Sequence, residues 1–238
     1  MKKTLVFVWV LLSLNLLKAQ NPSVLVVAGG HSFDTIAFFR MMDKIPGIGY
    51  DFMLQPEANR YLAAVDTIPY GLLVFYDMWE PVNNEEKDAY LKLTKSGKPM
   101  LFLHHALVSY QQWPEFEKII GGRYVQDMKN GQLKPSELST YKHDVWINVK
   151  VCDPQHPVTS GMGNFRIFDE VYGNYRVGEQ VKPILKTDHP ESTEIIAWEN
   201  RYNQSTIIYI QPGHDKKTYE DDHYLQLLKQ AVQYLLNK

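Results

Sequence analysis

The feature that most constrains the fold is a set of short, almost wholly apolar segments at residues 24–28, 71–76 and 100–103. Strands that are buried on both faces of a parallel sheet have this composition, because helices cover both sides of such a sheet. Between the first two lies a segment, 34–44, with apolar residues at near-helical spacing. The chain is therefore predicted to alternate strands and helices, as α/β proteins do.

Local signals predict the other elements. Beyond residue 144 apolar and polar residues alternate, which is typical of a half-exposed strand and indicates a β excursion at the edge of the sheet. The remaining predicted elements are a strand at 50–54, a helix capped by Asn84 that ends before Gly97, a helix at 113–120, a hairpin of 195–198 with 206–210, and a last helix at 223–236.

The N-terminal segment has the pattern of a secretory signal peptide. Lys2 and Lys3 precede an apolar run at 5–17, and the small residue Ala19 is followed by polar residues. The run is shorter than the roughly 20 apolar residues that a membrane span requires. Residues 1–19 are therefore predicted to be a signal peptide, and residues 20–238 one exported α/β domain, periplasmic or extracellular, without a membrane span.

Composition excludes several classes of function. A formal net charge of −2 provides no basic surface for nucleic acid. Cys152 is the only cysteine, so an intrachain disulfide and a zinc site built from several cysteines are both excluded. Nothing in the sequence indicates an oligomeric state.

Candidate site residues follow the predicted strands. In open α/β sheets, ligands bind beyond the carboxyl ends of the strands. Histidines follow three of four such ends, in a chain that has only eight. A single histidine there is more often structural, but their joint position predicts one cleft. The residues at these ends are His31, Asp77, Trp79, His104, His105 and His214.

The adjacent pair His104 and His105 restricts the chemistry of this cleft. Neighbouring residues of an extended chain point to opposite faces, so both can reach one site only if the chain turns sharply, as in a nucleophile elbow. Neither position holds a Ser or Cys nucleophile. Imidazole groups favour acid–base catalysis or metal binding over acyl transfer.

A second group of candidates lies at residues 168–172. Alternation places Glu170 and Tyr172 on one face, where they can join the histidines, although a solvated surface strand would show the same pattern. His143, beside Asp144, is a candidate of the same kind. His156 and His189 each precede a proline and are assigned to turns.

Several separated motifs resemble the ThuA-like, or trehalose utilisation, family. They are Leu103-His104-His105-Ala106, Trp113-Pro114-Glu115-Phe116, Gly121-Gly122-Arg123, His143, His156-Pro157-Val158-Thr159, Asp169-Glu170-Val171-Tyr172, Ala197-Trp198 and Gly213-His214. The resemblance covers nearly all of 20–238.

This resemblance implies a flavodoxin-like, class I glutamine amidotransferase-like fold, which is a three-layer sandwich with a mostly parallel central sheet. It also implies a role in the metabolism of trehalose-type disaccharides and their 3-keto forms. Amidotransferases have a cysteine at the elbow, where this chain has His104-His105-Ala106. Glutamine amidotransfer is therefore not expected.

Three hypotheses follow. The first is an exported hydrolase or lyase whose small-molecule substrate is a glycoside or its 3-keto derivative. The second is a non-catalytic sugar-binding module, and the third, a structural protein, has no support in the sequence. For the enzyme, the predicted catalytic residues are His104, His105, Glu170 and His214, and the predicted substrate-binding residues are His31, Asp77, Trp79, His143 and Tyr172. A divalent metal is a variant, with ligands drawn from His31, His104, His105, Glu170 and His214.

Overall fold

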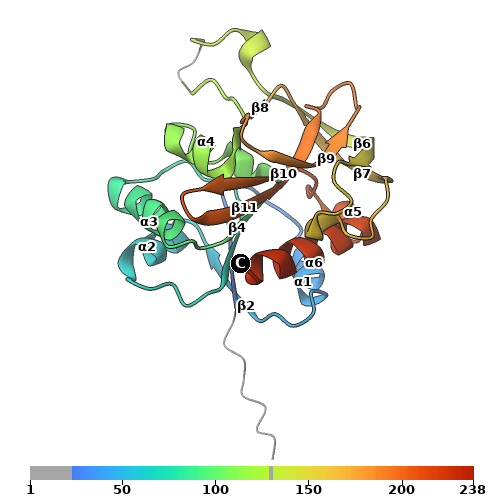
Figure 1. The fold of residues 1–238 in the computed structure, drawn as a ribbon. Helices are drawn as coiled ribbons and strands as arrows, with labels where there is room; N and C mark the ends of the chain where they lie inside the picture. The colour runs from blue at the N-terminus through green and yellow to red at the C-terminus, as the bar shows by residue number, and fades with distance from the viewer. Residues whose placement is uncertain (1–22, 129–130) are drawn as a thin grey trace, which may run out of the picture.

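The computed structural model describes residues 23–128 and 131–238, so the predicted signal peptide lies outside the described residues. One nine-stranded sheet forms the centre of the molecule (Figure 1). Its strands, in spatial order, are β2 (Tyr50–Leu54), β1 (Val24–Gly29), β3 (Leu72–Asp77), β4 (Met100–Leu103), β11 (Ser205–Ile210), β10 (Ile195–Tyr202), β9 (Lys182–Thr187), β6 (Thr140–Val151) and β7 (Phe165–Gly173). A two-stranded sheet pairs β5 (Gly122–Arg123) with β8 (Arg176–Val177).

The first five strands of this order are parallel and carry helices on both faces. One face is covered by α1 (Thr35–Asp43), α5 (Lys216–Tyr219) and α6 (Asp222–Leu236), and the other by α2 (Glu57–Ala64), α3 (Asn84–Lys95) and α4 (Pro114–Ile120) (Figure 1). The described residues also form three 3-10 helices, which are η1 (His104–Val108), η2 (Pro135–Glu137) and η3 (Pro157–Thr159). The order β2-β1-β3-β4-β11 is that of flavodoxin-like folds, so the predicted fold class is confirmed.

The core is divided by the sheet, as the buried strands predict. Val24 and Val26 face the α1 and α6 layer, whereas Leu25 and Val27 face the α2 and α3 layer. None of the helices in the described ranges is long and apolar enough to cross a membrane.

The start of α3 differs by one residue from the expectation. Asn83, not Asn84, is the cap, because its side chain accepts a hydrogen bond from the backbone of Glu86, whose carboxylate accepts one from the backbone of Asn83. This reciprocal capping box satisfies two backbone donors at once and determines where the helix begins.

The antiparallel half of the sheet, β10-β9-β6-β7, is the predicted edge excursion, and it coils back over the parallel half. β7 lies five strands from β4 in the sheet order. At about 4.8 Å per strand, a flat sheet would separate them by about 24 Å. Yet Glu170 on β7 contacts His104, directly after β4, at 2.8 Å. The coiling therefore brings the last strand to the carboxyl ends of the parallel strands.

Candidate functional site

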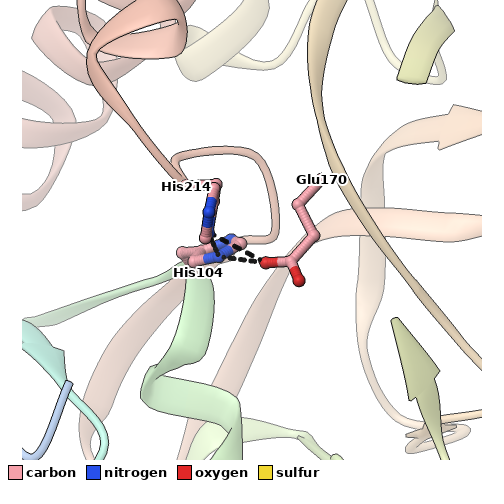
Figure 2. Close-up of side chains that lie close together, drawn as sticks. All are labelled: His104, Glu170 and His214. Atoms are coloured by element: carbon pink, nitrogen blue, oxygen red, sulfur yellow. Dashed lines mark hydrogen bonds and ion pairs between the residues drawn. The ribbon is translucent and has the colours of Figure 1, made fainter. Parts of the chain in front are cut away.

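Three side chains from three segments converge at the carboxyl ends of the strands (Figure 2). His104 Nε2 lies 2.8 Å from Glu170 Oε2, which lies 3.1 Å from His214 Nδ1. The two imidazole nitrogens are 3.3 Å apart. One carboxylate oxygen and two ring nitrogens thus form a compact triangle, which we call the His104–Glu170–His214 cluster.

His104 is held in one orientation by the chain around it. Its φ of 50° makes the sharp turn that the adjacent histidines require, and η1 begins there. The ring is fully buried, and Nδ1 lies 2.7 Å from the carbonyl oxygen of Gln211. Because a carbonyl can only accept, Nδ1 carries the hydrogen. Nε2 is therefore the ring nitrogen that faces Glu170.

His214 is positioned through the backbone that precedes it. Asp169 accepts hydrogen bonds from the backbone N–H groups of Gly213 and His214, at 2.6 and 3.1 Å. Gly213 has a φ of 137°, and a Cβ there would lie 2.7 Å from the hydroxyl of Tyr224. The two adjacent carboxylates thus have different roles, because Asp169 holds the loop while Glu170 contacts the histidines.

Gln211 connects both sides of the cluster, and the sequence did not single it out as a candidate. Its side-chain amide donates to the carbonyl oxygen of Glu170 at 2.8 Å, while its own carbonyl accepts from His104. The available signal was a polar residue between a buried strand and Pro212. Gln211 therefore fixes the distance between the strand that carries Glu170 and the ring of His104.

The electrostatics separate the titratable groups into two sets. Burial raises the pKa of Glu170, but hydrogen bonds with His104 and His214 outweigh burial and leave that pKa below its ordinary value. The hydrogen bond with Glu170 raises the pKa of His214. Burial lowers the pKa of His31 and, more strongly, that of His105. Glu170 is consequently ionised, and His31 and His105 are neutral, at neutral pH.

A cavity of about 250 Å³ lies beside the cluster. It is smaller than the roughly 300–1,000 Å³ typical of pockets for drug-sized ligands, so it suits a small ligand. Five of its lining residues, Met78, Val108, Tyr124, Gln126 and Tyr141, were not predicted. The full lining is His31, Met78, His105, Val108, Tyr124, Gln126, Tyr141, His143, Glu170 and Tyr172.

Four expected residues surround the cavity and the cluster. The ring of His31 lies 4.8 Å from that of His105, whose Nε2 donates to the carbonyl oxygen of Tyr76 at 3.2 Å. Within the described ranges, Nδ1 of His105 is buried without a partner. His143 is half exposed, with Nδ1 3.4 Å from Glu170, and the hydroxyl of Tyr172 lies 2.9 Å from His104 Nε2.

Neither Asp77 nor Trp79, both expected to bind substrate, lines this cavity, and their role stays a prediction. Asp77 is 1% exposed and accepts a hydrogen bond from Gln55 at 2.8 Å. Burial raises the pKa of its carboxyl to about 7. At the end of β3 the side chain points into the α2 and α3 layer, and Trp79 packs against the core of the same layer.

His156 and His189 lie elsewhere, as expected of turn residues. His156 begins η3, where its Nδ1 accepts from the backbone of Val158 and its Nε2 contacts Glu199 at 3.1 Å. His189 lies in the loop after β9.

The sheet order, the coiled antiparallel half and an elbow at the end of β4 define a class I glutamine amidotransferase-like α/β protein. In place of an elbow cysteine it has His104 and His105. The chain belongs to the ThuA family, described as trehalose utilisation, whose family model matches residues 23–235.

Solved structures share this fold at low sequence identity. A ThuA-like protein from Parabacteroides merdae is 16% identical with a TM-score of 0.75, and 90% of each chain is covered. One from Bacteroides uniformis is 19% identical with a TM-score of 0.68, over 91% of this chain and 93% of that chain. A GMP synthase protein from Thermoplasma acidophilum is 10% identical with a TM-score of 0.53, over 90% of this chain and 94% of that chain. A comparison with curated proteins found no match.

Proposed function

We propose that this protein is an exported enzyme that acts on glycosides, such as trehalose-type disaccharides or their 3-keto derivatives, by histidine and carboxylate chemistry. The observation that carries the proposal is an ionised, buried Glu170 between His104 and His214, at the wall of a small cavity. Family membership supports the class of substrate. The N-terminal pattern of residues 1–19 supports export.

The chemistry that suits these groups is eliminative cleavage of a 3-keto glycoside. The keto group acidifies the hydrogen on C2, and a base removes it as a proton. The electron pair forms an enediolate at C2 and C3, which then expels the oxygen substituent of C1. That leaving oxygen takes up a proton, so the products are an unsaturated keto sugar and an alcohol.

His105 is the base in this proposal. Its Nε2 donates to the carbonyl oxygen of Tyr76, so Nδ1 has the lone pair, and this atom has no partner in the described part of the chain. Burial lowers the pKa of the ring, which keeps it neutral and able to accept a proton. His31, His143 and Tyr172 line the same cavity and are assigned to the sugar hydroxyls.

An enediolate requires positive charge beside its oxygen. The His104–Glu170–His214 cluster, which reaches the cavity wall through Glu170, can supply it, either as the imidazolium of His214 or as a bound divalent cation. The hydrolase and lyase alternatives differ in whether water adds to the cleaved sugar.

The test is incubation of the purified mature protein with trehalose and 3-ketotrehalose in deuterated water, followed by NMR. The proposal expects cleavage of 3-ketotrehalose to an unsaturated keto sugar that has no hydrogen on C2, and deuterium at C2 of the recovered substrate where proton removal is reversible. A general base contributes about 10²–10⁴-fold, so His105→Gln should lower the rate at least about 100-fold. His223→Gln, at an exposed histidine on α6, is the matched control. Sugar binding without cleavage or exchange would replace the enzyme with a binding module.

A further inference from the structure

We propose that His104 Nε2, His214 Nδ1 and Glu170 Oε2 bind one divalent first-row transition-metal ion, for which Zn²⁺ is the best match (Figure 2). The inference deepens the proposed function and rests on it only for the role of the ion, which is to stabilise negative charge on substrate oxygen. The assignment of the ligands stands on the geometry of the cluster.

The first argument concerns the hydrogen atoms. Nδ1 of His104 donates to the carbonyl of Gln211, so Nε2 is the ring nitrogen left to bind an ion. Nε2 faces the Oε2 atom of Glu170 at 2.8 Å and the hydroxyl of Tyr172 at 2.9 Å. A proton on Nε2 or a metal ion can lie between the ring nitrogen and the carboxylate oxygen. The backbone carbonyl that fixes the ring is the usual outer partner of a metal-binding histidine.

The second argument concerns the size of the triangle. Its sides are 2.8, 3.1 and 3.3 Å. Its centre is about 1.8 Å from each corner, so an ion about 1 Å out of the plane lies about 2.1 Å from all three atoms. That distance is the ordinary one between Zn²⁺ and histidine nitrogen or carboxylate oxygen. The three atoms can therefore bind one ion almost without movement.

The third argument concerns the kind of ion and its free positions. Two imidazoles suit Zn²⁺ and its first-row neighbours, whereas Mg²⁺ and Ca²⁺ prefer oxygen ligands. Three protein ligands leave a tetrahedral ion one further position, as in catalytic rather than structural zinc sites. Of the three ligands, Glu170 lines the cavity, so an ion bound by its carboxylate would lie at the cavity wall.

The experiment measures metal binding without any sugar. Chelator-treated protein is titrated with Co²⁺, followed by its visible absorption, and with Zn²⁺ by calorimetry. We expect one ion per chain. Partners outside the ligand shell are worth about 10–100-fold in affinity, so Glu170→Gln and His214→Ala should each cost at least about 100-fold. The side chain of His214 is 24% exposed, so its removal is compatible with folding, which circular dichroism checks.

Two matched controls define the specificity. His156→Gln alters another buried histidine that contacts a glutamate, and His223→Ala alters a surface histidine 3.5 Å from Asp221. Both should retain the metal affinity of the wild type. So should His31→Ala, which removes a residue that the sequence also offered as a metal ligand. Absence of one-to-one binding in the wild type, or unchanged binding in folded Glu170→Gln and His214→Ala, would overturn the assignment.

Failure of this inference and failure of the proposed function are distinguishable. Metal bound by the three residues without sugar turnover contradicts the function and leaves the site. Turnover that persists in metal-free protein contradicts the role given to the ion and leaves both the histidine chemistry and the ligand assignment, which the binding titration tests.

Discussion

Two buried histidine–glutamate pairs in this protein have similar nitrogen–oxygen distances, but the Nδ1 atoms of their histidines have opposite hydrogen-bonding roles. His156 and Glu199 are 3.1 Å apart, and His104 and Glu170 are 2.8 Å apart. Nδ1 of His156 accepts from the backbone of Val158, so its Nε2 has the hydrogen and donates to Glu199. Nδ1 of His104 instead donates to Gln211, and its Nε2 faces Glu170, His214 and Tyr172 at once.

The surroundings of the two carboxylates differ in the same sense. Glu199 also accepts hydrogen bonds from Tyr234 and Arg201. It does not line the cavity beside Glu170. Glu170 has two imidazoles and a cavity. The difference teaches that the distance of an ion pair does not reveal its role, whereas the position of each hydrogen does. We infer that the first pair serves stability and the second serves function.

The largest effect should separate the two pairs by activity. Glu170→Gln should lower turnover of a 3-keto glycoside by at least about 100-fold, because it removes a group of the cluster itself. Glu199→Gln should leave turnover within about twofold at a temperature where it is folded. Steady-state kinetics measures both variants. Equal losses in the two would break the distinction.

The next effect should separate them by stability. At neutral pH, Glu199→Gln should lower the free energy of unfolding by about 2–3 kcal/mol, since hydrogen bonds to a buried charge are lost. Calorimetry should then show a Tm lower by about 5–10 °C. In chelator, Glu170→Gln should keep or raise the Tm, because its amide N–H can donate to Nε2 of His104. A clear fall in that Tm would contradict our account.

The pH dependence of the first pair sharpens the same contrast. Burial alone would raise the pKa of Glu199, but hydrogen bonds from His156 and Tyr234 outweigh burial and lower it to about 2. A depressed carboxyl pKa contributes stability that is present above the ordinary value of 4.5 and lost as the pH falls toward 2. The stability difference between wild type and Glu199→Gln should therefore shrink over this range in acid denaturation. A constant difference would show that the charge is not responsible.

The smallest effect concerns Gln211, which positions the cluster without belonging to it. Gln211→Ala removes the hydrogen bond to the carbonyl oxygen of Glu170 but keeps the backbone carbonyl that holds His104. We expect Co²⁺ affinity to fall about 10-fold, the lower end for an outer partner. Gln230→Ala, at a half-exposed glutamine on α6, is the control. An unchanged Co²⁺ affinity and spectrum would assign Gln211 to stability alone.

Much of the fold could be predicted because its parallel strands are buried on both faces. The bounds 50–54 and 100–103 match β2 and β4, and the predicted hairpin and edge excursion are present. Helix α2 was missed, since it is short and buries only Ala58, Asn59 and Leu62. Its apolar pattern is too brief to reveal a helix.

The candidate site was predicted in part. His104, His105, Glu170 and His214 lie together as expected from the strand ends, and their catalytic roles stay predictions. Asp77 was expected in the cleft, but alternation at the end of β3 turns its side chain into the core. Sequence alone does not show to which face of the sheet the last residue of this strand points. Glu170 was chosen because alternation places it on one face with Tyr172, but the meeting of that face with His104 depends on the coiling of the distant strands, which no local pattern encodes.

That coiling has a consequence for where the proposed ion would be acquired. His104 follows β4 and His214 follows β11 in the parallel half, whereas Glu170 arrives only with β7, the last strand of the order. On the proposed assignment, a chain in which only the parallel strands have folded has His104 and His214 in place but lacks Glu170, the third ligand. A chain that is exported before it folds would therefore carry no metal across the membrane. The metal ions available outside the cytoplasm, rather than the order of metal affinities inside it, would then determine which ion binds.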